Sequence, residues 1–500
     1  MHKGESASRS GLVAKASIWV VAGKLTARAI DLCSLLILAH LLSPSEFGLI
    51  ALAMATILIV EVVVELPLAQ AMVRIPDLTE PILATAFTLG LLRGILLALL
   101  LGLLALPLSL FYQEPRLLVL VWALTSAPIL RGLVSPWMVV FVRRFDFRRE
   151  FALDVIGKSS ALIVATAIAL KTGSYWAIAG GIITTPFVAV VMSYVFAPMR
   201  PRLTLSQWPV FSDMVSWNTA SQLVSAVNWQ MDKLLLGRLI DLPSFGRYSV
   251  ADNLAGIPQQ ALVQPLTRPL MAGFATINSP AEYAPAYCKA MNALVATTAP
   301  ILVCVAMLSD PLVRLVLGER WIGAAVMLQW LASSYLLSVP TEALPPLAMA
   351  INRTRFVAVR MIAELVVKLP ALIIGLALFG LTGALAARCI ATAAVLISVG
   401  FIARSLIGVS LKQQGLALWR PAVSCAAMAV FLHFVAPFVI SQQSTWFLML
   451  ATAAAGLAAV GVYGVALLVL WIASNRPAGI EAVVMHNASR LFTFMRSRTA

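Results

Sequence analysis

Charged residues are scarce in this chain of 500 residues. Asp, Glu, Lys and Arg make up 11% of it, 61% is hydrophobic, and the mean hydropathy is +0.94. A soluble domain carries roughly a quarter of its residues as charged side chains. So few charges cannot cover a water-facing surface, which excludes a string of ordinary soluble domains. The net charge of +15 therefore does not indicate nucleic-acid binding, because no polar domain exists to display a basic patch.

Motifs of catalysis and metal binding are also missing. The five cysteines form no C-x-x-C pair, the four histidines are scattered, and neither a P-loop nor an H-E-x-x-H motif occurs. The loops predicted to lie outside the cell are short and hold no grouped carboxylates of the kind that a membrane glycosyltransferase would need. These absences favour a carrier over an enzyme, with no resident cofactor and no direct use of ATP.

Long apolar runs are present instead. A spanning helix needs about 20 residues, and hydrocarbon demands internally paired backbone groups, so the runs predict an all-α polytopic membrane protein. Reading the runs against Pro, Gly and charge breaks gives about fourteen spans: 15–39, 47–72, 81–111, 117–142, 152–170, 176–198, 210–236, 246–270, 287–309, 322–350, 357–379, 383–406, 421–440 and 446–472. The first run has no cleavage site and contains charges, so we interpret it as a retained span rather than a signal peptide.

Cations gather in alternate loops. Arg143, Arg144, Arg148 and Arg149 lie in the fourth loop, and the other even-numbered loops are also rich in Arg, whereas the odd-numbered loops hold few. By the positive-inside rule the even loops and both termini face the cytoplasm. An even number of spans agrees with that orientation.

A short internal repeat indicates two lobes. The turn that begins at Leu42 (L-S-P-S-E-F-G) recurs from Asp241 as D-L-P-S-F-G, six predicted spans later. Because six is even, the two units have the same orientation, and a parallel repeat implies two six-helix lobes around a central cavity. The match is short, and such a turn can also arise as a common way into a helix. We expect a cytoplasmic amino end (1–14), an N-lobe (15–200), a C-lobe (201–410), two further spans (411–473) and a basic cytoplasmic tail (474–500).

Ionisable residues inside the first two spans are the strongest candidates for a site. Lys24, Arg28 and Asp31 share one face of the first span, and Glu61 and Glu65 share a face of the second. In an antiparallel pair of helices, Arg28 lies near the depth of Glu61 and Lys24 near that of Glu65, which predicts a buried acid–base cluster. The cations would receive an anionic head group, and a carboxylate would accept H⁺ or Na⁺ during the cycle. The alternative is that these charges only neutralise one another and pin the two helices together.

The seventh and eighth spans carry further polar residues. Asn218 and Gln222 lie in the seventh, and Gln260, Gln264 and Arg268 recur at intervals of four in the eighth. Facing lipid, such amides would lack partners, so we expect them to line water. Prolines at 258, 265 and 269, and at 340, 345 and 346, predict kinked helices that could bend as the two lobes rock. Arg93, Arg388 and Asp252 lie near helix ends and are expected to reach the membrane surface or solvent there.

Several stretches together resemble a known family. They are residues 37–53, the loop at 143–148, and the segments 228–238 and 245–251. They are similar to the bacterial polysaccharide transporters, the oligosaccharide flippase branch of the multidrug/oligosaccharidyl-lipid/polysaccharide exporter superfamily. The resemblance implies an inner-membrane protein that moves undecaprenyl-diphosphate-linked oligosaccharides to the periplasmic leaflet by alternating access, for lipopolysaccharide or exopolysaccharide synthesis. It also implies membrane lipid, a polysaccharide polymerase and a chain-length regulator as partners.

Related lipid flippases place basic residues of the first and eighth helices against the diphosphate. Lys24, Arg28 and Arg268 correspond by helix and residue type only. Two other functions stay open: a cation-coupled multidrug exporter, in which Asp31, Glu61 and Glu65 would bind the drug and the neighbouring cations would hinder it, and a scaffold for polysaccharide assembly that transports nothing.

Overall fold

The computed structural model describes residues 2–211, 218–442 and 444–474, with side chains from residue 19 onward in the first helix and from 226 onward in the seventh predicted span. Every regular element in these ranges is helical, which confirms the all-α prediction. The chain divides into two compact units, Met1–Gly246 and Arg247–Ala500. The predicted lobes divide instead at residue 200 and stay a prediction. The predicted basic tail lies outside the described residues, apart from its first residue.

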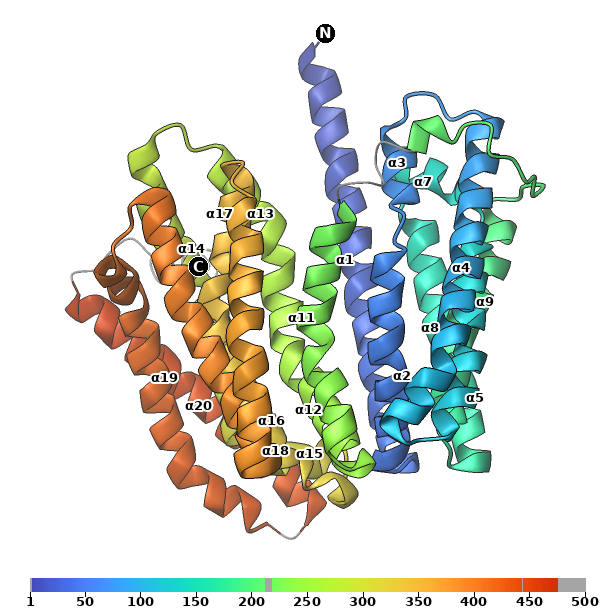
Figure 1. Ribbon diagram of the computed structural model, residues 1–500. Helices are drawn as coiled ribbons and strands as arrows, with labels where there is room; N and C mark the ends of the chain where they lie inside the picture. Colours follow the sequence, from blue (N-terminus) through green and yellow to red (C-terminus); the bar gives the residue numbers. More distant parts are fainter. Residues whose placement is uncertain (1, 212–217, 443, 475–500) are drawn as a thin grey trace, which may run out of the picture. The chain divides into compact units, whose positions relative to one another are not determined.

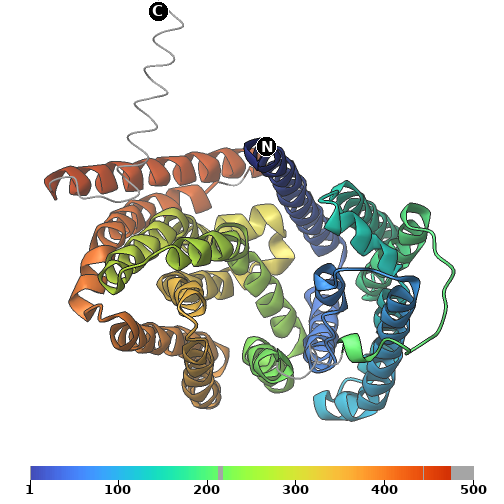
Figure 2. The same cartoon turned by 90° about the horizontal axis from the view of Figure 1, so that it is seen from above.

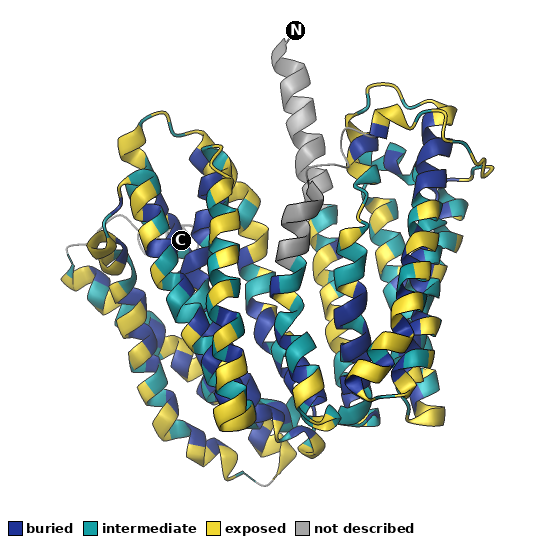
Figure 3. Ribbon diagram, viewed as in Figure 1, coloured by how far each residue is buried: buried dark blue, intermediate teal, exposed yellow. Residues whose placement is uncertain are grey.

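The lengths and compositions of the helices fit a multi-pass membrane protein. Among the described residues, 8 helices are long and apolar enough to cross a membrane, or 9 if one bent pair is counted as a span. The 53-residue helix described below is one of these. Exposed residues run along whole helices in both units (Figure 3), and many of them are large and apolar, as lipid-facing surfaces are. The number of fourteen spans stays a prediction.

The first unit is built from the helices of the first six predicted spans and α11 (Figure 1). Their bounds are α1 His2–Leu41, α2 Pro44–Val63, α3 Leu68–Arg74, α4 Glu80–Tyr112, α5 Arg116–Leu124, α6 Ser126–Gly132, η1 Pro136–Met138, α7 Val139–Arg143, α8 Arg148–Thr172, α9 Trp176–Phe196 and α11 Asn218–Leu239. Helices α8 and α9 lie side by side (Figures 1 and 2). In addition α1 packs on α8, α11 on α2, and α4 on both α5 and α6.

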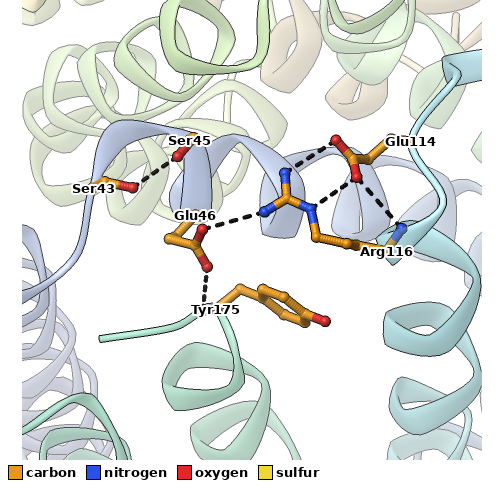
Figure 4. A network of polar contacts seen from close by, with 6 residues as sticks. All are labelled: Ser43, Ser45, Glu46, Glu114, Arg116 and Tyr175. Carbon is orange, nitrogen blue, oxygen red and sulfur yellow. Dashed lines mark hydrogen bonds and ion pairs between the residues drawn. The ribbon is translucent and has the colours of Figure 1, made fainter. Parts of the chain in front are cut away.

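A polar network ties three turns at one end of this unit (Figure 4). Pro44 at the first position of α2 suits a helix start, and Glu46 follows in the first turn. The Glu46 carboxylate accepts a hydrogen bond from the backbone N–H of Tyr175 (2.6 Å) and lies 3.4 Å from Arg116. Arg116 in turn donates two bonds to Glu114, at 2.8 and 3.1 Å. The turns after the first, third and fifth predicted spans therefore lie at one end, as alternating spans require.

This network should weaken in acid. The hydrogen bonds from Arg116 hold the pKa of the Glu114 carboxyl below its ordinary value. A lowered folded-state pKa gives a stabilisation that is complete above the unfolded value of about 4.3 and is lost as pH falls through the folded value. We expect protection of the 112–116 turn from proteolysis to fall as the pH is lowered below the unfolded value of about 4.3, and Glu114→Gln to remove that dependence. An unchanged acid response in Glu114→Gln would assign the effect to another group.

At the other end of the unit, the even-numbered connections meet. Arg143 donates to the carbonyl oxygen of Pro76 (2.6 Å), and the backbone N–H of Thr204 donates to the Thr88 hydroxyl (2.9 Å). Arg202 lies 3.9 Å from Glu80. These contacts join the second, fourth and sixth predicted loops, which agrees with the predicted alternation.

The two copies of the repeated turn are in contact within this unit. A Cβ atom built on Gly48 would lie 2.3 Å from the carbonyl oxygen of Leu242, and one on Gly246 would lie 1.8 Å from that of Pro44. The two helix starts thus cross with backbone against backbone. Glycine is required at both positions by this close approach.

The second unit contains most of α12 and the helices that follow it. Their bounds are α12 Leu242–Pro258, η2 Gln259–Val263, η3 Gln264–Leu266, α13 Thr267–Ala275, α14 Pro280–Met307, α15 Ser309–Val316, η4 Glu319–Trp321, α16 Ala324–Ser338, η5 Val339–Ala343, α17 Leu344–Ala350, α18 Arg355–Ile407, α19 Leu411–Ile440 and α20 Thr445–Ala473. Helix α14 packs against α16 and α19, and α19 against α20. Their shared core includes the fully buried Tyr287, Leu302, Leu344 and Met428.

Helix α18 consists of two arms that fold back on each other. Gly380 has a φ of +60°, which favours glycine. Eight residues apart, Gly375 and Gly383 touch, since a Cβ atom on Gly383 would lie 1.9 Å from the carbonyl oxygen of Gly375. A continuous helix would hold them about 12 Å apart. The two arms match the predicted spans 357–379 and 383–406.

Candidate functional site

Two cations on α1 have exposed side chains. Lys24 and Arg28 are exposed, and within the part of the chain whose side chains are described neither has an ion-pair partner. The cause is the packing of α1, which contacts α8 through Trp19 against Phe151, with ring centroids 5.2 Å apart, and through Gly23. Lys24 is near enough to Glu150 of α8 for an electrostatic interaction.

The acids that were predicted to neutralise these cations have other partners. Glu61 forms an ion pair with Arg131 of α6, and Asp31 forms one with Lys158 of α8. Glu65 is exposed, and its electrostatic partner is Arg93. The prediction of one buried cluster between the first two spans is therefore wrong: α1 packs mainly against α8, while α2 packs mainly against α11.

Exposed cations in an apolar span need a polar environment. A charged side chain at mid-membrane costs a few kcal/mol or more unless water or an opposite charge reaches it. Among the described side chains, none forms an ion pair with Lys24 or Arg28, so their exposed faces require water or an external anion. The structure therefore leaves two cations, at i and i+4 on one helix face, available to a ligand.

The predicted stripe on the eighth span is interrupted. Helix α12 ends at Pro258, followed by a π turn that begins at Gln259, a 3₁₀ turn and α13, so the span is interrupted where the prolines predicted a kink. Gln260 is half-buried, whereas Gln264 and Arg268 are exposed. The mixed turns disturb the spacing of four from which a single stripe was predicted. The side chains of Asn218 and Gln222 lie outside the described residues, so their predicted place beside water is untested.

The tenth predicted span is broken as well. Helix α16 ends at Ser338, a 3₁₀ turn covers Val339–Ala343, and α17 begins at Leu344. The interruption lies where Pro340, Pro345 and Pro346 predicted a kink. Glu342 lies in the break, and its carboxylate is 3.0 Å from Arg360 of α18.

Sequence reasoning missed a polar network in the second unit. Arg388 of α18 lies 3.0 Å from Asp252 of α12 and donates to the Tyr248 hydroxyl at 2.8 Å. Tyr335 of α16 donates to Asp252 at 3.2 Å. The Arg388 and Asp252 side chains are 15% and 13% exposed, so the expectation that both reach the membrane surface or solvent is wrong.

Removing one partner of this pair should destabilise the protein. A mostly buried charge left alone costs about 3 kcal/mol or more, whereas replacing both charges with uncharged groups is often neutral. We expect Asp252→Asn to lower the thermal stability of the purified protein, and Asp252→Asn combined with Arg388→Met to recover most of the loss. A double variant no more stable than the single one would show that the pair is not an independent unit.

No cluster that could hold a metal stands out. Among the described residues, no three His, Cys, Asp or Glu side chains are grouped to hold a metal ion. The described cysteines are free thiols. What the site offers is charge and hydrogen bonding, which can bind and release an anion without changing a covalent bond.

Arg131 and Lys158, the partners of the acids, were also missed. Both lie inside predicted spans, and an ionisable residue within a span is itself a signal of a partner or a site. That signal was available at both positions. The sequence did not show which acid each residue pairs with, because Arg131 is 70 residues from Glu61 and Lys158 is 127 residues from Asp31.

Known proteins resemble this chain along most of its length. The lipopolysaccharide biosynthesis protein WzxC of Escherichia coli (strain K12) is 22% identical over 78% of this chain and 81% of its own. The succinoglycan biosynthesis transport protein ExoT of Rhizobium meliloti (strain 1021) is 24% identical over 66% and 67%. The fold matches the lipid II flippase MurJ in an inward closed conformation, with a TM-score of 0.70, 14% identity, and coverage of 91% of this chain and 99% of that one.

A family model confirms the resemblance found in the sequence. The model described as polysaccharide biosynthesis protein matches residues 37–326, more than half of the chain. The matched region contains both copies of the repeated turn and the ion pair between Glu61 of α2 and Arg131 of α6. The chain therefore belongs to the polysaccharide biosynthesis protein family.

Proposed function

We propose that the protein is a flippase that moves undecaprenyl-diphosphate-linked oligosaccharides from the cytoplasmic to the periplasmic leaflet of the bacterial inner membrane. The observation that carries this proposal is the pair of exposed cations Lys24 and Arg28 on α1, for which the described side chains provide no ion-pair partner. A diphosphate supplies the anion that these residues lack. The family membership and the fold support the same function.

Without a carrier, a sugar head group faces a large free-energy barrier in the membrane. Moving a sugar head group through hydrocarbon would leave its hydroxyls unpaired, at several kcal/mol each, so a tetrasaccharide faces a barrier of tens of kcal/mol. A hydrated path removes most of that barrier, while the polyprenyl tail stays in lipid. The protein then acts by alternating access as a carrier, with an H⁺ or Na⁺ gradient as the proposed source of energy. A polysaccharide polymerase and a chain-length regulator are its proposed partners.

The multidrug exporter is the second candidate. It would need free carboxylates for a cationic substrate, yet Asp31 and Glu61 are paired with Lys158 and Arg131. The exposed cations Lys24 and Arg28 on α1 would also repel such a substrate. The charges therefore favour the flippase.

Transport can be tested in a strain whose own copy is deleted. We expect deletion to trap the lipid-linked oligosaccharide on the cytoplasmic face and to abolish surface polysaccharide, and the wild-type gene to restore both. The measurement is the amount of lipid-linked intermediate on each face of the membrane. Normal polysaccharide with raised sensitivity to cationic dyes would establish the exporter instead. Loss of polysaccharide with intermediates still reaching the periplasmic face would establish the scaffold.

A further inference from the structure

Two predicted spans of the first unit are broken beside the same charged residues. Helix α2 ends at Val63 and α3 begins only at Leu68. The fourth span bends by 53° between Gly132 and Pro136. Broken helices inside membranes are tolerated where they are buried in protein or line water, and they commonly form binding sites for ions and substrates.

Helix α4 contacts both of these breaks. It crosses α6 so closely that a Cβ atom on Gly132 would lie 2.4 Å from the carbonyl oxygen of Gly90. Arg93, one turn after Gly90, donates from Nε to the carbonyl oxygen of Val64 in the first break, at 2.9 Å. Arg131 directly precedes Gly132, at the second break. The crossing therefore brings two guanidinium groups together.

Two carboxylates offset these cations. Arg131 is paired with Glu61, and Arg93 interacts electrostatically with Glu65, Glu61 and Arg131. The two side chains of this ion pair differ in exposure: that of Arg131 is 49% exposed and that of Glu61 is 15% exposed. One guanidinium nitrogen of Arg131, Nη1, thus contacts an acid, while about half of the side chain is exposed.

A guanidinium has five N–H donors in one plane and binds carboxylate and phosphate through the same paired geometry. A phosphate oxygen that approaches the open side of Arg131 competes directly with Glu61. If it displaces Glu61, the freed carboxylate is still within the field of Arg93 and is not left alone in the membrane. The exchange conserves charge pairing and requires no covalent step.

We propose that Arg131 is a further residue that binds the substrate's diphosphate, and that Glu61 is an internal anion that holds the place of this group until the substrate displaces it. The proposal rests on the proposed function, because it assumes a diphosphate substrate. It assigns Glu61 to competition with the substrate and not to ion coupling. Return of Glu61 to Arg131 favours release of the product.

The direction in which Glu61→Gln changes the binding affinity distinguishes this proposal from an ion pair that is only structural. The full-length protein is purified in lipid nanodiscs, and binding of farnesyl diphosphate, a short polyprenyl diphosphate, is measured by calorimetry. We expect Glu61→Gln to tighten binding by about fivefold, because the competing charge is gone. We expect Arg131→Gln to weaken it by about tenfold, Arg131→Lys to give an intermediate value, and the double variant to match Arg131→Gln.

The control is Glu80→Gln, which removes an exposed ion pair with Arg202 in the same unit and should leave binding unchanged. A misfolded variant cannot bind more tightly, so a gain in Glu61→Gln cannot arise from damage. Weaker or unchanged binding in Glu61→Gln would overturn the proposal and leave the pair as a contact between α2 and α6. Absence of binding in the folded wild-type protein would instead overturn the proposed diphosphate substrate, and this inference with it.

Discussion

Replacing both Lys24 and Arg28 by alanine is expected to stop transport while leaving the protein in the membrane at normal levels. Each charged hydrogen bond to a phosphate contributes about 1.5–3 kcal/mol, so losing two should lower the transport rate about 100-fold or more. Folding should be spared, because neither side chain is buried or paired within the described part of the chain. The measurement is the lipid-linked oligosaccharide retained on the cytoplasmic face.

Two variants make this experiment specific. Lys24→Arg with Arg28→Lys keeps both charges and should retain most activity. Arg202→Ala removes an exposed cation of a connecting segment and should transport normally. Normal transport by the Lys24, Arg28 double alanine variant would refute the anion site on α1, even if the protein is a flippase.

Gly246→Val should prevent the protein from reaching its folded state. The added Cβ would lie 1.8 Å from the carbonyl oxygen of Pro44, so a backbone segment rather than a flexible side chain has to move. Overpacking of this kind costs about 3 kcal/mol, the upper end of the usual range, and a valine adds two further methyl groups. We expect a sharp fall in the thermal stability of the detergent-purified protein, or in its yield.

The matched control lies on α20. Gly464→Val changes the same residue type within a helix, but a Cβ atom there has nothing within 4 Å. It should be close to wild type in yield and melting temperature. Equal damage from the two substitutions would mean that helix propensity, and not the contact between the repeated turns, decides the outcome.

The helical architecture was within reach of sequence reasoning because the membrane imposes it. Apolar runs of sufficient length must be helices in lipid, and Pro265 and Pro340 each lie in a real interruption of a span. Loop lengths and the alternation of cation-rich and cation-poor loops then predict the direction in which each span crosses the membrane. Gly380 lies between two predicted spans, and its positive φ is what a tight reversal needs.

The partners of the charged residues were out of reach. Helices in lipid lack the amphipathic pattern that shows which face is buried in a soluble protein, so the neighbour of α1 could not be chosen. The prediction took α2, the next helix in sequence, whereas α1 packs on α8. The same limitation hid the pairing of Asp252 with Arg388. Ionisable residues within the spans indicated which spans carry polar contacts, but they did not show which residues form those contacts.

The bond between Glu46 and Tyr175 also constrains the order of events during synthesis. The two residues are 129 positions apart, and a ribosome that adds 5–20 residues per second needs roughly 10 s to make the intervening chain. Until then the first hairpin sits in the bilayer with Glu46 lacking its backbone donor. The first two spans therefore cannot complete this contact before the fifth predicted span has been made.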